Sequence, residues 1–315
     1  MPLFDCLTKK QSLYKIKYNL CIQKTKGGKT MNQLELEAYA KINLGLDVVR
    51  RLENGYHEVR MIMQTVGICD TVLLEKAEAG IRMFSDSEDA PADEANLAYK
   101  AAKLFLESTG EQGGVCIHLK KRIPVAAGMA GGSTDAAAVL KGMNVLFDTC
   151  LSEKALREIG VKLGADVPYC IMGGTALAEG IGEKLTKLPD APATCLLIAK
   201  PDISVSTKYV YENLNLSQIE NHPDISGMTE AVKQGALSGI IDRMENVLES
   251  VTEKKYPIIA QLKHFMEENG AVKAMMSGSG PTVFGIFKEE KAAGLAKDKL
   301  EKMGLAKQIF VTTFR

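Results

Sequence analysis

Apolar and polar positions alternate most clearly just after Met31, and a period of two predicts β-strands. We expect two strands at 34–38 and 42–49, followed by a turn at Asn54-Gly55. The same pattern predicts strands at 71–75, 80–84, 115–119 and 196–200, a strand–glycine–strand unit at 274–287, and a last strand at the C-terminus. Polar or glycine-containing segments separate these strands.

Apolar residues spaced three and four positions apart predict helices between the strands. The helix at 96–108 is expected to end at Gly110, because glycine readily adopts the left-handed conformation that closes a helix. Further helices are predicted at 133–147, 153–163, 206–213, 228–234, 240–249 and 257–269, with one more before the last strand. Strands and helices mix without the strict alternation of a doubly wound sheet, so we expect an α+β fold.

The first thirty residues differ from the rest, because lysines are scattered through them without a periodic apolar pattern. The body of the protein is therefore expected to begin at Met31. The preceding segment is interpreted as a translated upstream stretch, an expression remnant or a flexible arm. Its end, 26–30, resembles part of a phosphate-binding P-loop, but Gln23 stands where the motif needs glycine and no strand precedes it. We therefore exclude a P-loop.

The 315-residue chain has 39 basic and 39 acidic residues, so its formal net charge of zero argues against a nucleic-acid or membrane-surface binder. Its seven cysteines form no C-x-x-C pair, and together with four histidines they show no zinc-ligand spacing. We interpret them as reduced thiols of a cytoplasmic protein. No apolar run reaches the length of a membrane span.

The strongest chemical signal is a loop of small residues between a predicted strand and a predicted helix. It comprises Pro124, Val125, Ala126, Ala127, Gly128, Met129, Ala130, Gly131, Gly132, Ser133 and Thr134. The first amides of a helix lack partners within the helix, and the helix dipole adds positive potential there. Small residues let phosphate oxygens approach those amides, so the loop predicts a phosphate site. Ser133 and Thr134 are expected to cap the helix or to reach a phosphate or Mg²⁺.

Three other segments carry polar residues whose role is open from the sequence alone. Lys41, on a predicted strand, would by itself be read as a solvated surface lysine. Asp166 stands in a turn before Pro168, where aspartate usually caps the local backbone. The segment 277–281, Ser-Gly-Ser-Gly-Pro, fits either a plain hairpin turn or a second loop facing phosphate.

These four segments, in their order along the chain, resemble motifs of the GHMP kinases. That family includes galactokinase and the homoserine and mevalonate kinases. The resemblance covers the chain from about Met31 to its end. It implies a two-domain fold with a ribosomal-protein-like N-terminal domain at 31–188, a ferredoxin-like C-terminal domain at 189–315, and an active site between them. Ala126 and Ala127 replace glycines of the family loop, so we expect either negative φ angles at both positions or a slightly different way of binding.

The resemblance also implies roles for individual residues. Lys41 and Asp166 are expected to be catalytic, and the small-residue loop, Asn96 and Lys121 are expected to bind ATP. Asn43, Tyr56, His57 and Tyr211 are expected to bind the phosphate acceptor, with the aromatic residues around a cytosine ring. Asp166 is the expected general base.

The reaction implied is transfer of the γ-phosphate of ATP, with Mg²⁺, to a hydroxyl of a cytidine-diphosphate-linked sugar alcohol. It would serve the non-mevalonate route to isoprenoid precursors. Phosphorylation of mevalonate or homoserine, and non-catalytic nucleotide binding on the same fold, are the alternatives. Apart from these small molecules, no nucleic-acid or membrane partner is expected, and the chain is expected to be a monomer or a weak homodimer.

Overall fold

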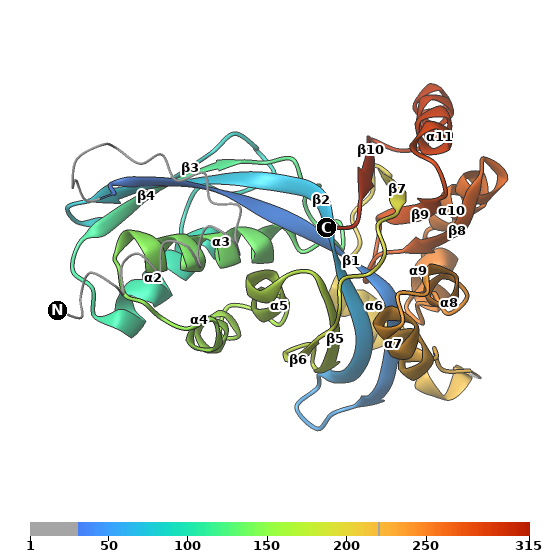
Figure 1. The fold of residues 1–315 in the computed structure, drawn as a ribbon, viewed down its shortest axis with the longest axis horizontal. Coiled ribbons are helices and arrows are strands. Elements are labelled where there is room, and N and C mark those ends of the chain that lie inside the picture. The colour runs from blue at the N-terminus through green and yellow to red at the C-terminus, as the bar shows by residue number, and fades with distance from the viewer. Residues whose placement is uncertain (1–30, 220) are drawn as a thin grey trace.

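A computed structural model describes residues 31–219 and 221–315, which fold around two β-sheets. The first sheet and its helices lie on one side of the molecule in Figure 1, and the second sheet with its helices lies on the other. The expectations for residues 1–30 lie outside the described residues. In the described part of the chain, no helix is both long and apolar enough to cross a bilayer.

A long antiparallel hairpin of β1 (Gln33–Arg51) and β2 (His57–Ala77) runs through the first half of the molecule. The two strands predicted at 34–38 and 42–49 are therefore one strand. Register shifts between Tyr39 and Lys41 and between Asn43 and Gly45 interrupt the pairing, and such bulges bend a strand without ending it. Most of β2 was not predicted, because its apolar residues do not alternate regularly.

The first sheet has the order β3-β4-β2-β5-β6, with β1 also paired to β2. The added strands are β3 (Gly80–Ser85), β4 (Gly114–Lys120), β5 (Thr175–Gly180) and β6 (Lys184–Lys187). Four helices cover one face, as Figure 1 shows: α2 (Leu97–Thr109), α3 (Gly131–Leu146), α4 (Glu153–Gly160) and α5 (Val167–Met172). Helix α3 is almost wholly buried, which fixes the loop that precedes it.

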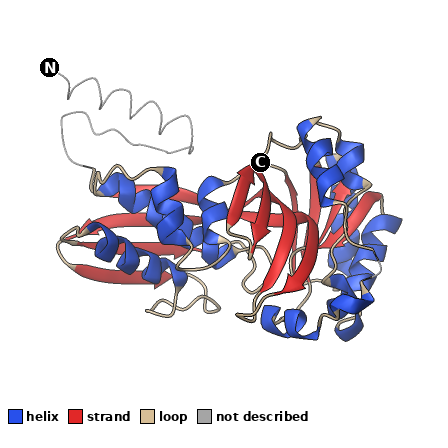
Figure 2. Ribbon diagram, turned by 90° about the horizontal axis from the view of Figure 1, so that it is seen from below, coloured by secondary structure: helices blue, strands red, loops and turns tan. Residues whose placement is uncertain are grey.

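The second sheet has the antiparallel order β10-β7-β9-β8. Its strands are β7 (Cys195–Lys200), β8 (Ala271–Met276), β9 (Val283–Phe287) and β10 (Gln308–Thr313). Its helices are α6 (Thr207–Asn213), η1 (Leu216–Gln218), α7 (Ile225–Lys233), α8 (Leu237–Ile241), α9 (Glu249–Lys255), α10 (Ile258–Glu268) and α11 (Glu290–Met303). In Figure 2 the strands of this sheet lie toward the middle of the molecule, with helices packed outside them.

Strand β1 packs against both halves of the molecule, and its burial pattern differs between its two ends. Its first residues alternate between buried and exposed, whereas every residue from Ala40 to Val48 is buried. Ala40, Ile42 and Leu44 enter an apolar cluster with residues of the C-terminal half, such as Leu196 and Met228. Lys41 and Asn43 lie between them in sequence, and their side chains therefore point to the other side of the strand.

Two helix predictions were wrong. The helix predicted at 240–249 is divided, because α8 ends at Ile241 and α9 begins at Glu249, with an irregular stretch between them. Helix α5 was not predicted, because the residues before Pro168 were interpreted as a turn that follows the helix at 153–163. Proline instead occupies the first turn of α5, where its missing N–H costs nothing.

Candidate active site

The small-residue loop turns directly into α3, and its backbone bends sharply to do so. Ala130, the residue before the helix, has a left-handed φ of 58° and makes no side-chain cap. Among the described residues, the amides of Gly131, Gly132 and Ser133 have no recorded backbone or side-chain acceptor. Three donors therefore converge at the positive end of a buried helix, as an anion site requires.

Of the two roles expected for Ser133 and Thr134, capping the helix and reaching a phosphate or Mg²⁺, the structure excludes capping. Both residues lie inside α3, and neither accepts a capping bond. The Thr134 hydroxyl donates to the Tyr39 carbonyl at 2.8 Å, which ties the helix to β1. The Ser133 hydroxyl has no hydrogen-bond partner in the part of the chain that the structure describes, so it can turn toward a ligand.

Of the two alternatives for the loop alanines, negative φ at both positions is excluded, because the φ of Ala126 is 51°. Ala127 is not among the residues with positive φ, and its side chain is buried. A left-handed alanine costs about 1–2 kcal/mol relative to its right-handed form. The loop thus turns sharply at Ala126, although it lacks the glycine that would adopt this conformation without strain.

The Ser277 segment, a turn between β8 and β9, packs directly against the small-residue loop. The Ser277 hydroxyl donates to the Gly128 carbonyl at 3.0 Å. A Cβ atom on Gly128 would lie 2.3 Å from the Ser277 carbonyl oxygen, so only glycine fits there. The segment is therefore a hairpin turn that packs against the loop and supports it.

Lys41 is also tied to this loop, and it meets Asp166. The Lys41 amide donates to the Met129 carbonyl at 3.2 Å. Its Nζ atom donates to Asn43 Oδ1 at 2.9 Å and lies 3.8 Å from Asp166 Oδ2. Lys41 is only 6% exposed, so it is not the solvated surface lysine that its sequence alone would favour.

Asp166 stands at the start of α5 but makes no side-chain cap to that helix. One third of its side chain, 33%, remains exposed to solvent. The carboxylate is thus held toward Lys41 on one side and reachable from outside on the other. An ammonium at this distance favours the ionised carboxylate and any negative charge that develops nearby.

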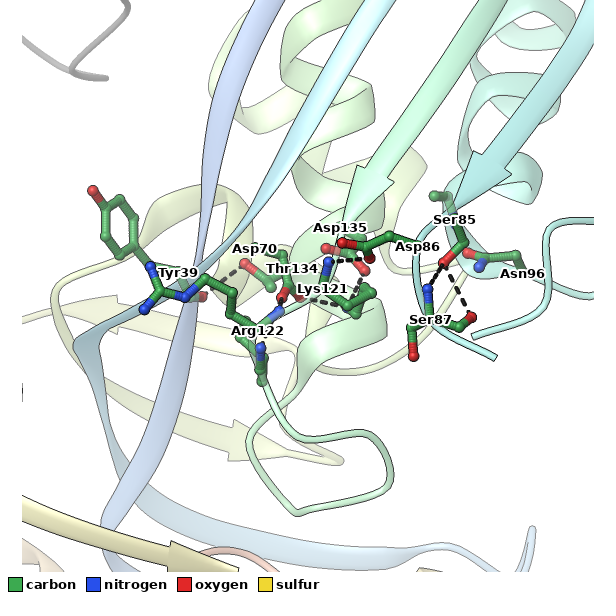
Figure 3. A network of polar contacts seen from close by, with 12 residues as sticks. Tyr39, Asp70, Ser85, Asp86, Ser87, Asn96, Lys121, Arg122, Thr134 and Asp135 are labelled. Atoms are coloured by element: carbon green, nitrogen blue, oxygen red, sulfur yellow. Dashed lines mark hydrogen bonds and ion pairs between the residues drawn. The ribbon is translucent and has the colours of Figure 1, made fainter. Parts of the chain in front are cut away.

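A second polar cluster lies beside the loop and was not predicted from the sequence. The Lys121 ammonium is buried between the carboxylates of Asp70 and Asp135, at 2.5 Å from Asp135 Oδ2 (Figure 3). Asp70 also accepts the amide of Ile123 at 2.8 Å. The cluster therefore joins β2 and the start of α3 to the segment after β4, and so helps to fix the loop. The clue was an aspartate at the start of an otherwise apolar helix.

Burial shifts the pKa values of this cluster. It raises the pKa of Asp135 to about 7, against the opposing effect of Lys121, and the neighbouring Asp70 adds to the rise. Asp135 Oδ1 is buried without a hydrogen-bond partner in the described chain, so its charge is poorly compensated. The pKa of Lys121 is raised, because both carboxylates outweigh the effect of burial.

Asn96 and Lys121 are the two residues outside the loop that are expected to bind ATP. Both lie near the loop, and their side chains already have hydrogen-bond or ion-pair partners within the protein. The Asn96 side chain caps α2 by accepting the Ala98 amide at 2.9 Å, and it donates to the Pro91 carbonyl at 2.7 Å. The Lys121 amide donates to Asp86 Oδ1 at 2.8 Å. In Figure 3, Lys121 lies in the middle of the network and Asn96 lies at its edge.

The aromatic residues expected around a cytosine come from both halves of the chain. The rings of His57, at the start of β2, and Tyr211, on α6, lie 5.2 Å apart and tilted by 39°. Burial and Arg51 lower the pKa of His57, which favours a neutral ring. Burial first, and then the Asp166 carboxylate, raise the pKa of Tyr211. Tyr56 is 60% exposed and is not part of this contact.

The geometry defines a class of protein: a two-domain α+β kinase with a glycine-containing phosphate loop. Sequence models described as "GHMP kinases N terminal domain" and "GHMP kinases C terminal" match residues 96–174 and 228–305. A 4-diphosphocytidyl-2-C-methyl-D-erythritol kinase of Lachnospira eligens is 52% identical over 283 residues, which are 90% of this chain and 98% of that protein. One of Caldicellulosiruptor bescii is 51% identical, over 89% of this chain and 98% of that protein.

The chain belongs to the 4-diphosphocytidyl-2-C-methyl-D-erythritol kinase family of GHMP kinases. A crystal structure of 4-(cytidine 5'-diphospho)-2C-methyl-D-erythritol kinase is similar, with a TM-score of 0.77 and 32% identity over 89% of this chain and 99% of that one. A homoserine kinase from Cytophaga hutchinsonii shares the fold, with a TM-score of 0.73 and 22% identity over 92% of this chain and 96% of that one. The predicted family and fold class are confirmed. The domain boundary at 188/189 stays a prediction.

Proposed function

We propose that this protein transfers the γ-phosphate of ATP to the 2-hydroxyl of 4-diphosphocytidyl-2-C-methyl-D-erythritol. The observation that carries the proposal is the pairing of Lys41 and Asp166, 3.8 Å apart, next to the free amides at the start of α3. The curated relatives that carry this activity in their names share about half of their residues with this chain over nearly their whole length. The reaction belongs to the non-mevalonate route to isoprenoid precursors.

In the proposed reaction, the acceptor oxygen forms a bond to the γ-phosphorus as the bond to the β,γ-bridging oxygen breaks, and ADP leaves. Asp166 takes the hydroxyl proton late, because an alcohol is far less acidic than a carboxylic acid. General-base help of this kind contributes about 10²–10⁴-fold to a rate. Lys41 stabilises the ionised Asp166 and the charge that develops on the acceptor oxygen.

The amides of Gly131, Gly132 and Ser133 would hold phosphate oxygens, and the buried α3 keeps those donors in place. Mg²⁺ bound together with ATP would supply positive charge to neutralise the phosphates. The Ser133 hydroxyl fits as a ligand, because it is unengaged among the described residues, whereas the Thr134 hydroxyl is bound to Tyr39. Asn96 and Lys121 are proposed to line the adenine side of this site.

The acceptor would lie across both halves of the molecule. Asn43 already touches Lys41 and is proposed to contact the erythritol end. The rings of His57 and Tyr211 are proposed to hold the cytosine, assisted by the segment that contains Tyr56. At 5.2 Å, the two rings contact each other, so sandwiching a base would require them to move apart.

An acceptor screen tests the proposal. The full chain is incubated with ATP, Mg²⁺ and either the cytidyl substrate, mevalonate or homoserine, and ADP formation is coupled to a spectroscopic readout. We expect turnover with the cytidyl substrate alone, and phosphorus NMR of the product should place the new phosphate on the 2-hydroxyl. Turnover with mevalonate or homoserine but not with the cytidyl substrate would overturn the proposal.

A further inference from the structure

Three metal-ligating side chains meet on the face of the first sheet that points away from α2 and α3. Glu75 lies on β2, and Cys116 and His118 lie two residues apart on the neighbouring β4. Glu75 is directly opposite Cys116 in the strand register, and alternate residues share a face. Val115, Ile117 and Leu119 point into the core on the other side.

The donor atoms already lie at distances that suit a tetrahedral cation. Cys116 Sγ is 3.3 Å from His118 Nε2, and His118 Nε2 is 3.3 Å from Glu75 Oε2. All three donors lie within 4.8 Å of one another. Zinc bonds of about 2.0–2.3 Å in a tetrahedron give donor–donor edges of roughly 3.3–3.7 Å. Two of the three separations thus match before any ion is added.

The surroundings of these donors suit a zinc-type ion better than magnesium. A thiolate and an imidazole are ligands for zinc-type ions, whereas magnesium takes oxygen ligands. One thiolate and one carboxylate would neutralise a divalent charge, although Arg82, which pairs with Cys116 from β3, adds one positive charge nearby. The His118 ring is stacked on Phe84, with centroids 5.0 Å apart, so its orientation is already restricted.

Cys116 differs from an ordinary surface cysteine because its side chain is buried. The residue is only 6% exposed, and desolvation raises the pKa of its thiol while Arg82 partly lowers it. Without a cation the thiol therefore stays protonated. A bound zinc ion would displace that proton, so binding should weaken as the pH falls.

We propose that Glu75, Cys116 and His118 bind one thiophilic divalent cation of the zinc type, with water completing the tetrahedron. The ion would join β2 to β4 on the face away from the helices. These strands lead to the phosphate-loop cluster, because β2 carries Asp70 and β4 is followed directly by Lys121. The site is independent of the proposed kinase reaction and uses none of its residues. No metal-ligand spacing along the chain predicted this site, because the third donor, Glu75, lies on another strand.

The first experiment measures metal binding by the full chain. Zn²⁺ is added in equilibrium dialysis, and Co²⁺ is added as a spectroscopic probe, since a thiolate–Co²⁺ bond absorbs in the near ultraviolet. To exclude thiols of the first thirty residues, the background carries Cys6→Ser and Cys21→Ser. We expect one equivalent of either ion, with the thiolate band present, and a melting temperature that rises with added Zn²⁺.

Two variants and two matched controls decide the proposal. Cys116→Ser should abolish the thiolate band, and His118→Ala, at a half-buried position, should weaken Zn²⁺ binding at least tenfold, because even outer-shell changes cost about that much. Cys150→Ser and His264→Ala, which change an exposed cysteine and an exposed histidine paired with Glu268, should alter nothing. Kinase activity of His118→Ala with Mg²⁺ should be unchanged.

Two outcomes would overturn the proposal: failure of the chain to bind Zn²⁺, or Zn²⁺ binding by the Cys116 and His118 variants equal to that of the unchanged chain. The three side chains would then form a hydrogen-bonded cluster without a metal.

Discussion

Lys41 Nζ lies 3.8 Å from Asp166 Oδ2, although Lys41 lies on a long strand and Asp166 directly precedes a short helix. Their surroundings are unequal, because Lys41 is buried and bonded to Asn43 while Asp166 keeps part of its surface open. The buried partner is fixed, and the open partner is accessible to a substrate. This inequality suits a lysine that supplies charge and an aspartate that takes a proton.

The first prediction concerns Asp166→Asn, which keeps the shape of the side chain but removes the base. We expect turnover of the cytidyl substrate to fall about 10²–10⁴-fold, while ATP affinity measured by calorimetry stays the same. Lys41→Met should cause a comparable loss, and the double variant should fall little further, because the two residues act as a unit. Asp202→Asn, at an exposed aspartate, is the control. Turnover within twofold of the wild type in Asp166→Asn would remove the proposed mechanism.

A second prediction tests the contact between the two loops through Gly128→Ala. The new Cβ would meet the Ser277 carbonyl at 2.3 Å, and Gly128 has a left-handed φ of 73°. We expect weaker ATP binding and a loss of stability of at least about 1–3 kcal/mol, measured by urea unfolding. Gly294→Ala is the matched control, because Gly294 lies on α11 with nothing near its Cβ position. If Gly128→Ala has the same stability and the same ATP affinity as Gly294→Ala, the two loops do not pack as closely as described.

The third prediction separates the two substrates at Tyr211. Removing the ring in Tyr211→Ala should raise KM for the cytidyl substrate roughly 5- to 150-fold, as expected from about 1–3 kcal/mol of base stacking. KM for ATP should not change. Tyr211→Phe keeps the ring and should bind the cytidyl substrate nearly as well as the wild type. Equal effects of Tyr211→Ala on both KM values would argue against a cytosine site here.

A fourth prediction follows from the pKa of Asp135, which burial raises from 3.8 to about 7. Between these two pH values the folded chain keeps a proton that the unfolded chain has lost. The contribution of Asp135 to the free energy of unfolding therefore falls as the pH rises from about 4 to about 7, and it is constant above that. Asp135→Asn cannot titrate, so its stability relative to the wild type should increase across this range.

Urea unfolding of both proteins at several pH values within and above this range measures the difference. A relative stability that does not change with pH would mean that Asp135 is ionised throughout, held by Lys121. The same data would then assign the buried cluster as a permanent ion pair.

Much of the fold followed from local patterns. The boundaries of α2 were predicted within a residue or two, because Asn96 and Gly110 mark its ends with residues suited to caps. Helix α3 and strand β4 were also located closely, since each has a regular apolar pattern. The errors fell where local pattern and tertiary packing disagree, as in β1, where bulges interrupt the alternation of one continuous strand.

In the candidate site too, features set by local sequence could be predicted, whereas features set by tertiary contacts could not. The phosphate loop could be located because small residues before an apolar helix act locally, through backbone amides that any helix start provides. The kinase family could be identified because the motifs keep their order along the chain. The cluster of Asp70, Lys121 and Asp135 could not, because its three charges come from separate elements.

The sequence by itself determined the two mixed α+β halves, the loop at the start of α3 and the residues that mark the family, because these depend on neighbours along the chain. Only the tertiary structure decided that Lys41 is buried, that Asp166 faces it instead of capping α5, and that Ser277 supports Gly128. The physical reason is that burial and charge pairing are set by which strands and helices pack together. Those contacts join residues far apart in sequence, where no local period records them.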